Sequence, residues 1–258
     1  MFGRDPAAYE RARLGYPARI YSILEERCGL GPGTRALEIG PGAGTVSREL
    51  LRRGAGALTL VEPDRRFVRY LRSRLTGASA QVTFVPRPFE RARLLPGSYD
   101  LAVAASSFHW LPPRRSLRKI SRALGSGGWW ANWNNHHGDP YRPTPFHRAL
   151  EELYRVEDGR STTPAEDRAH DVRSARRRLA AHRASGAFDR ISLERVHWSV
   201  TLPTARVVAL WASFSDIVTR PPARRRRFLE GLARIVDEQF DGRATISVLT
   251  PVYTARRV

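Results

Sequence analysis

Two short segments carry residues whose types and spacing suit the binding of a nucleoside. One apolar run enters a glycine-rich turn over residues 37–44, and a second apolar run ends in the acid Glu62. Glycine lets the backbone approach a ligand because it has no Cβ atom. A carboxylate can accept two hydrogen bonds from a ribose diol, and parallel α/β sheets hold such ligands at the carboxyl ends of their strands. The two segments therefore predict a nucleoside-containing ligand.

The spacing of the glycines separates the classes of nucleoside ligand. A dinucleotide fingerprint reads G-x-G-x-x-G, and counting from Gly40 its third glycine position is held by Thr45. The acid and glycines of this chain follow the pattern E-x-G-x-G-x-G instead, at Glu38, Gly40, Gly42 and Gly44. The turn therefore does not match the dinucleotide fingerprint, although a glycine-rich turn of another α/β protein stays open as an alternative.

Predicted strands alternate with predicted helices over the first half of the chain, which indicates βαβ units and a parallel sheet. The expected strands are 35–39, 57–61, 82–85, 101–105 and 129–133. The expected helices are 6–29, broken by Pro17, then 45–53, 65–75 with Asp64 as N-cap, and 114–124. Residues 125–128 are glycine-rich and are expected to form a turn.

The pattern changes after residue 134, where a polar, proline-rich stretch precedes more helices. The expected helices are 146–156, 168–184, 205–218 and 223–239, and the expected strands are 191–200 and 244–253. Four ranges follow: cap helices at 1–30, a ligand-binding core at 31–135, a helical lid or insertion at 136–187, and a completion of the sheet at 188–258. We expect the insertion and the N-terminal helix to form a lid over the ligand-binding site.

The formal net charge of +19 raises the question of a nucleic-acid partner. All but one of the 44 basic residues are arginine, with Lys119 the exception, which indicates a coding bias rather than a selected phosphate-binding face. The arginines are also dispersed along the chain. We therefore expect no nucleic-acid partner.

Other features of the composition restrict the class of protein. Cys28 is the single cysteine, so an intrachain disulfide and a cysteine-based zinc site are excluded. The sequence shows no signal peptide and no apolar run near the roughly 20 residues of a membrane span. His136 and His137 have only Asp139 close by, so no metal is expected. These features predict a cytoplasmic protein without membrane contact.

Further segments carry a resemblance to a known family. The E-x-G-x-G-x-G pattern resembles the first motif of the class I S-adenosylmethionine (SAM)-dependent methyltransferases. Residues 98–110, which end in Phe-His-Trp, and the helix with Tyr9, Arg13 and Tyr16 before Pro17 resemble one group of that family. The group includes enzymes similar to trans-aconitate methyltransferase and other small-molecule methyltransferases. The resemblance covers residues 2–135 and continues weakly beyond them.

The resemblance implies a fold, a cofactor and cofactor-binding residues. The fold would be a Rossmann-like α/β fold, with a mostly parallel seven-stranded sheet, helices on both faces and a helical lid after the fifth strand. The cofactor would be SAM, with S-adenosylhomocysteine as product. The residues that match cofactor-binding positions are Tyr9, Arg13, Glu38, Gly40, Pro41, Gly42, Gly44, Glu62, Pro63, Asp64, Phe89, Glu90, Ser106 and Phe108. Pro88 departs from the family, because many relatives have an aspartate there that accepts a hydrogen bond from adenine.

The same resemblance places acceptor-binding and catalytic candidates. His109 follows the loop expected beside the sulfonium and is the candidate general base. Candidates for the acceptor pocket are Tyr16, Trp110, Trp133, His136 and His137. A hydroxyl acceptor needs a base, for which the chain offers His109, His136 or His137. A carboxylate acceptor needs only cationic positioning, for which it offers Arg13.

The sequence thus favours a methyltransferase that acts on a small molecule, most favourably at a hydroxyl or carboxylate oxygen. Two alternatives stay open. One is an RNA- or protein-directed methyltransferase that uses the basic surface, although the D/N-P-P-aromatic motif of amino-adenine enzymes is absent. The other is a SAM-binding protein whose function is regulation or chemistry other than methyl transfer.

Overall fold

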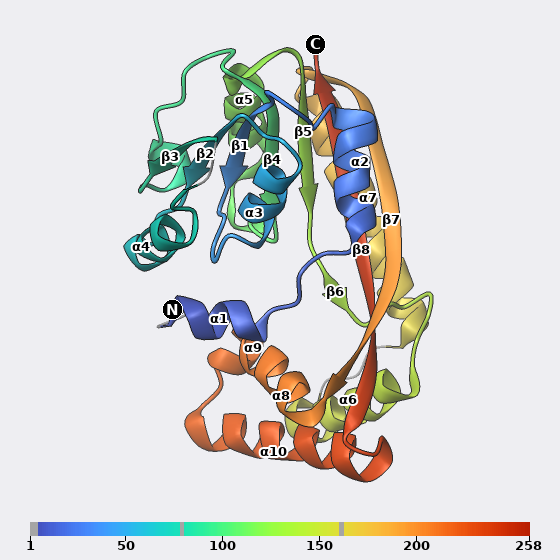
Figure 1. The fold of residues 1–258 in the computed structure, drawn as a ribbon. Coiled ribbons are helices and arrows are strands. Elements are labelled where there is room, and N and C mark those ends of the chain that lie inside the picture. Colours follow the sequence, from blue (N-terminus) through green and yellow to red (C-terminus); the bar gives the residue numbers. More distant parts are fainter. Residues whose placement is uncertain (1–4, 78–79, 160–162) are drawn as a thin grey trace. The chain divides into compact units, whose positions relative to one another are not determined.

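The computed structural model describes residues 5–77, 80–159 and 163–258, and their contacts divide into two compact units (Figure 1). The core unit consists of residues 16–77, 80–135, Ser174–Val196 and Thr250–Val258. The helical unit consists of residues 5–15, 136–159, 163–173 and His197–Leu249. Both units therefore combine segments that are distant in the sequence.

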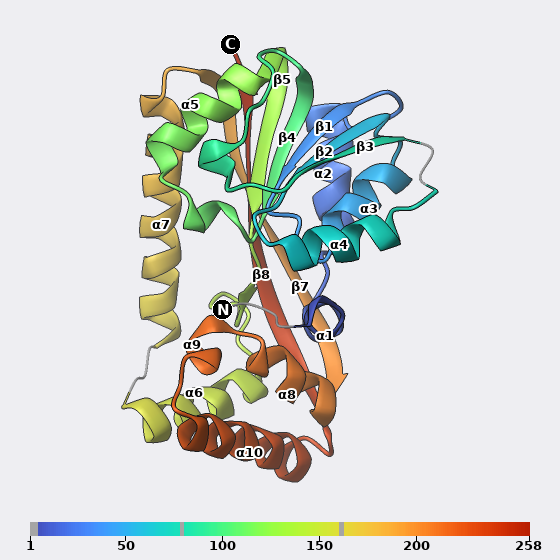
Figure 2. The ribbon, with the colours of Figure 1, turned by 90° about the vertical axis from the view of Figure 1, so that its left-hand side faces the viewer.

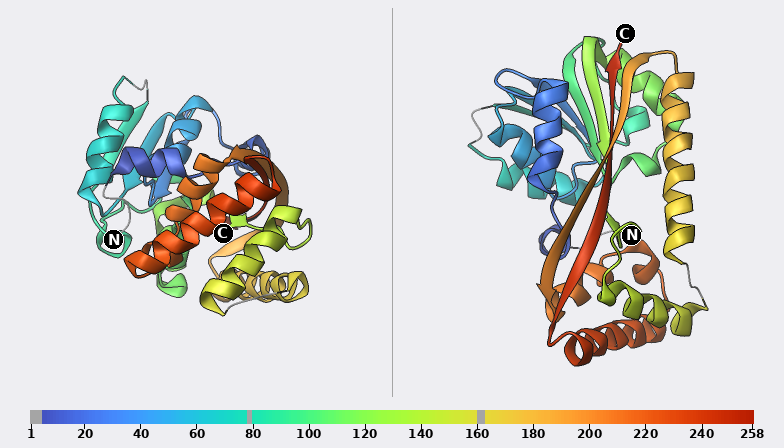
Figure 3. Two further views of the ribbon diagram at one scale, coloured as in Figure 1. Left: turned by 90° about the horizontal axis from the view of Figure 1, so that it is seen from below. Right: turned by 90° about the vertical axis from the view of Figure 1, so that its right-hand side faces the viewer.

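The described strands form one mixed sheet. They are β1 (Arg35–Ile39), β2 (Ala57–Val61), β3 (Gln81–Val85), β4 (Tyr99–Ala105), β5 (Leu124–Trp133), β6 (His136–His137), β7 (Phe188–Pro203) and β8 (Arg243–Arg257). Their order is β3-β2-β1-β4-β5-β8-β6, and β7 pairs with β8. The neighbours from β3 to β5 are parallel, whereas β8 is antiparallel to both β5 and β6. β7 runs beside β8, the strand with which it pairs (Figure 3).

The predicted α/β class with a mostly parallel sheet is confirmed, but the sheet has eight described strands rather than seven. The additional strand is β6, which has only two residues. The expected turn at 125–128 lies inside β5, where the register against β4 shifts between Tyr99 and Leu101. Glycine suits this irregularity because a Cβ on Gly128 would lie 3.0 Å from the Gly125 carbonyl oxygen.

Helices cover both faces of the sheet in the core unit. They are α2 (Ala18–Cys28), α3 (Thr45–Arg52), α4 (Arg65–Arg74) and α5 (Pro113–Ala123), together with the short 3₁₀ helices η1 (Phe89–Arg91) and η2 (Phe108–Trp110). Figure 2 shows α5 on one face and α2, α3 and α4 on the other. On the α5 side, Leu117 and Ile120 pack in one cluster with Leu37, Ala102 and Trp130 of the sheet. Burial of these apolar faces positions the strand ends.

Most of the helices after β6 belong to the helical unit, as does the first helix. They are α1 (Pro6–Ala12), α6 (Pro145–Asp158), α8 (Thr204–Ala212), α9 (Ser215–Val218) and α10 (Pro222–Gln239). Phe146, Trp211 and Phe228 lie in their shared apolar cluster. Helix α7 (Pro164–Ala184) contributes its first residues to the helical unit and its last to the core unit. Among the described residues, no helix combines the length and the apolarity that crossing a bilayer requires.

Local signals in the sequence correctly located two helix boundaries. Helix α1 ends at Ala12 and α2 begins at Ala18 after Pro17, so the predicted break at this proline is confirmed. Asp64 caps α4, and its side chain accepts a hydrogen bond from the Arg66 backbone N–H at 2.9 Å. This cap lies two residues after Glu62, which directly follows β2.

Candidate functional site

The glycine turn connects β1 to α3 and has three residues in the left-handed region. The φ angles are +70° at Gly40, +55° at Gly42 and +84° at Gly44. A Cβ on Gly40 would meet the Ser107 Cβ at 2.6 Å, and one on Gly44 would meet the Leu71 side chain at 2.4 Å. No atom lies within 4 Å of a Cβ on Gly42. Gly40 and Gly44 therefore allow close packing, and Gly42 leaves the backbone open to a ligand.

Glu62 lies at the end of β2 and is linked to this turn. Its carboxylate accepts hydrogen bonds from the backbone N–H groups of Gly42 at 3.2 Å and Asp64 at 3.0 Å. The residue is only 7% exposed, and burial raises the pKa of its carboxyl group. Because each carboxylate oxygen can accept more than one hydrogen bond, Glu62 retains acceptor capacity for a ribose diol.

The other acids of the motif face different groups. Glu38 is buried and accepts a hydrogen bond from the Ser47 hydroxyl of α3 at 2.6 Å. Burial raises the pKa of the Glu38 carboxyl group to about 7. Asp64, next to Pro63, pairs with the Arg66 guanidinium at 2.6 Å, which lowers the Asp64 pKa. Glu38 thus connects β1 to α3, and Asp64 acts as a helix cap.

The segment after β3 is held in place by the single lysine. The Lys119 ammonium of α5 donates hydrogen bonds to the carbonyl oxygens of Phe89, Glu90 and Ala92. The Phe89 side chain is buried in the core, and Glu90 is exposed. The sequence did not predict this role of Lys119, although a single lysine among 43 arginines could have marked the position as one with a specific contact.

The end of β4 carries a strained residue at the edge of the sheet. Ser106 has φ +53°, which is uncommon for a residue with a side chain. Its backbone N–H donates to the Trp133 carbonyl oxygen at 2.8 Å, and its hydroxyl lies 2.9 Å from the Tyr16 hydroxyl. The Tyr16 ring also meets the Trp133 ring edge-on at 5.8 Å between centroids. The structure therefore brings three predicted site residues together at the ends of β4 and β5.

Residues 108–110 form η2, directly after this edge. The Phe108 side chain is buried and contacts the Trp130 ring at 5.1 Å. His109 is exposed, and its ring lies 4.8 Å from that of Trp110, which is 62% exposed. Trp133 is only 2% exposed, and its indole N–H has no hydrogen-bond partner among the described residues. Trp110 and Trp133 therefore lie in different environments within the core unit.

Four of the predicted site residues belong to the helical unit. The Arg13 guanidinium lies over the ring of Tyr9 at 5.4 Å and over that of Phe214 at 5.3 Å. His137 is packed against Phe214 at 4.7 Å, and its Nε2 has no hydrogen-bond partner among the described residues. Burial, reinforced by Arg13, lowers the pKa of His137 to about 3, so its ring is neutral at pH 7. His136 precedes it in β6 and is half-buried.

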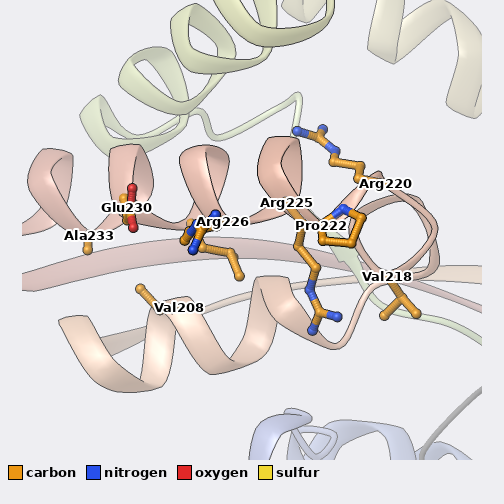
Figure 4. Close-up of a pocket in the computed structure, with 9 residues that line it drawn as sticks. Val208, Val218, Arg220, Pro222, Arg225, Arg226, Glu230 and Ala233 are labelled. Carbon is orange, nitrogen blue, oxygen red and sulfur yellow. The ribbon is translucent and has the colours of Figure 1, made fainter.

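A pocket of about 570 Å³ lies within the helical unit, between α8 and α10 (Figure 4). Apolar side chains of Val208 and Leu229 contribute to its lining, together with the charged Arg225, Arg226 and Glu230. None of the predicted site residues lines it. Over residues 5–77, 80–159 and 163–258, no group of three or more His, Cys, Asp or Glu side chains is arranged to hold a metal ion.

Comparisons with known proteins agree with this arrangement. Residues 36–128 match a family model described as a methyltransferase domain. An uncharacterized methyltransferase of Mycobacterium tuberculosis is 25% identical over 236 residues, which span 91% of this chain and 85% of the relative. A methyltransferase of Schizosaccharomyces pombe, also uncharacterized, is 26% identical over 128 residues, about half of each protein.

Solved structures share the fold. The YcgJ protein of Bacillus subtilis has a TM-score of 0.56 and 15% identity, over 93% of this chain and 99% of that protein. Geranyl diphosphate C-methyltransferase from Streptomyces coelicolor has a TM-score of 0.50 and 15% identity, over 93% of this chain and 78% of that enzyme. Residues 36–128 are therefore similar to a methyltransferase domain, and the chain has the fold of methyltransferases of known structure.

Proposed function

We propose that the protein transfers a methyl group from SAM to a hydroxyl or carboxylate oxygen of a small-molecule metabolite. The observation that carries this proposal is the group at the adjoining ends of β1, β2 and β4. There the open backbone at Gly42, the carboxylate of Glu62 and the strained Ser106 lie on one edge of the sheet. Ligands of open α/β sheets bind at this edge.

The residues present fit SAM. The Glu62 carboxylate would hold the ribose diol, and the Gly42 backbone would face the methionine part, which a Cβ would obstruct. When bound, SAM supplies an activated methyl group on a positively charged sulfur. The remaining contribution of the protein is to orient the acceptor oxygen toward that methyl group, because in-line transfer depends on positioning.

His109 is the proposed base for a hydroxyl acceptor. Its side chain is exposed and lies three residues after Ser106. A histidine can take a proton from a hydroxyl at neutral pH, which increases the nucleophilicity of the oxygen. Tyr16 and Trp133 support an acceptor site at the same edge, since the indole N–H of Trp133 is a donor without a partner among the described residues.

Two observations support a small molecule over a nucleic acid. Some arginines are paired with carboxylates of the same chain, as in Arg35–Asp100, Arg52–Glu49 and Arg220–Asp158, which lowers their availability to a phosphate. Structural neighbours named for their acceptors include methyltransferases of geranyl diphosphate and of phosphoethanolamine derivatives. We propose a cytoplasmic location, since Cys28 can form no intrachain disulfide.

The proposal is tested in two steps. Calorimetry should show binding of SAM and S-adenosylhomocysteine to the purified protein. A metabolite extract incubated with methyl-labelled SAM should then yield a labelled small molecule whose label lies on oxygen. Label on carbon or nitrogen would contradict the proposed acceptor atom. Labelling of RNA or protein alone would favour a macromolecular acceptor. Cofactor binding without methyl transfer would favour a SAM-binding protein whose function is regulation or chemistry other than methyl transfer.

A further inference from the structure

A buried amide near the carboxyl end of β5 has no partner. Asn132 is 1% exposed, and neither its Nδ2 nor its Oδ1 has a hydrogen-bond partner among the described residues. Leaving both a donor and an acceptor unpaired inside a protein is costly, and such groups are rare in native structures. The other residues from Trp129 to Trp133 are tryptophans and an alanine, so Asn132 carries the one amide side chain in this stretch. The amide therefore requires an explanation outside the packing of the strand.

The register of the sheet shows what surrounds this amide. Asn132 pairs with Ala104 of β4 on one side and with Tyr253 of β8 on the other. Side chains of directly paired residues lie on the same face of a sheet. Ala104 is two residues before Ser106, so Asn132 lies close to the strand ends where the cofactor and acceptor sites are proposed.

A cation from α7 contacts the same cluster. The Arg178 guanidinium lies over the Tyr253 ring at 5.4 Å, and its Nη1 is 3.5 Å from the Asn134 side-chain oxygen. Among the described residues, Arg178 forms no ion pair with a carboxylate. One helical turn later, His182 stacks on Tyr253 and accepts a hydrogen bond from the Trp130 indole at 3.1 Å. Burial lowers the pKa of His182, which leaves Arg178 as the positive charge on this cluster.

From this arrangement we infer that Asn132 and Arg178 form the binding site for an acceptor that carries a carboxylate with a hydroxyl beside it. The guanidinium and the Asn132 amide N–H donate to the carboxylate oxygens, and the amide oxygen accepts from the hydroxyl. This inference rests on the proposed function and narrows its substrate class to hydroxy acids. All of the residues involved belong to the core unit.

An ordered water molecule is the competing explanation, because buried waters commonly satisfy isolated polar groups. The two explanations differ in what Asn132→Leu does to the ligand-free protein. If the amide is unpaired until an acceptor binds, a leucine, which has the same branching and number of side-chain heavy atoms, should raise the melting midpoint by about 2–4 °C. If a structural water already satisfies the amide, the leucine should lower the midpoint, and that result would overturn the inference.

Methyl transfer supplies a second test on the full-length protein. A metabolite extract is divided by anion exchange, and each fraction is incubated with methyl-labelled SAM. Label should appear in the retained, anionic fraction, and kcat/KM for its main acceptor should fall about 10- to 150-fold in Arg178→Met. The matched control Arg177→Met changes an exposed neighbour on the same helix and should stay within about twofold.

The outcomes separate this inference from the proposed function. S-adenosylhomocysteine affinity should be unchanged in Arg178→Met, since the arginine is assigned to the acceptor alone. Label confined to the unretained fraction, or equal kcat/KM in the wild type and Arg178→Met, would overturn the inference while leaving a methyltransferase. Absence of label in every fraction would contradict the proposed function instead. The melting midpoint of Asn132→Leu tests the site without any methyl transfer.

Discussion

Replacing Glu62 is the most direct test of the cofactor site, because this carboxylate has two tasks. It accepts hydrogen bonds from the backbone N–H groups of Gly42 and Asp64 at 3.2 and 3.0 Å, and it is proposed to hold the ribose. Glu62→Ala removes both. The mutation should therefore weaken cofactor binding and also destabilise the turn in the absence of cofactor.

The magnitudes follow from these contacts. Loss of charge-assisted hydrogen bonds to the ribose should cost about 1.5–3 kcal/mol, or about 10- to 150-fold in the Kd for S-adenosylhomocysteine. Glu62 is 7% exposed, so the two amides would lose their acceptor in a mostly buried place. Each such loss costs about 1–3 kcal/mol, and for a chain of this size 1 kcal/mol corresponds to about 2–4 °C in Tm.

Glu62→Gln is the matched control, because it keeps the side-chain volume and one acceptor oxygen but removes the negative charge. Calorimetry with S-adenosylhomocysteine and thermal unfolding without ligand should be measured on both variants. We expect Glu62→Gln to lose about tenfold in affinity with a smaller change in Tm than Glu62→Ala. If Glu62→Ala lowers Tm but binds S-adenosylhomocysteine as tightly as the wild type, Glu62 only supports the turn and the ribose assignment is wrong.

Three further predictions concern other parts of the molecule. Burial raises the pKa of Glu38 from 4.5 to about 7, so ionisation of this carboxyl group opposes folding, and the free energy of unfolding should decrease as pH rises from 4.5 to about 7. Glu38→Gln should therefore stabilise the protein by about 3 kcal/mol at pH 8 and by little at pH 4. Equal shifts of the urea midpoint at both pH values would contradict this. His109→Asn should lower turnover about 10²- to 10⁴-fold with cofactor affinity intact, whereas weaker cofactor binding with preserved single-turnover transfer would exclude a base. If residues 134–187 and the N-terminal helix form a lid, a structure with SAM bound should place Trp110, Trp133 and His136 around the methyl group; side chains far from it would refute the lid.

Much of the core was predictable from the sequence because local chemistry determines it. The turn at 40–44 needs glycine wherever it occurs, since its backbone is left-handed at three positions. Pro17 directly precedes the first residue of α2, a place that suits its fixed geometry, and Asp64 caps α4 with its own side chain. The alternation of apolar strands and amphipathic helices likewise predicts a parallel sheet without knowledge of distant contacts. The resemblance to methyltransferases rests on the glycine turn and on the other motifs of residues 2–135.

Tertiary structure decided the roles that depend on which distant segments meet. Glu38 and Glu62 are both acids near strand ends, and both are buried. The packing of α3 gives Glu38 the Ser47 hydroxyl as its partner, whereas Glu62 accepts from the backbone of the glycine turn. His136 and His137 are adjacent and chemically alike, yet burial against Phe214 lowers the pKa of His137. Asn132 reads as an ordinary polar residue until the pairing of β5 with β8 and the cover of α7 leave its amide without a partner. Burial and pairing arise from residues far apart in the chain, so spacing along the sequence could not predict them.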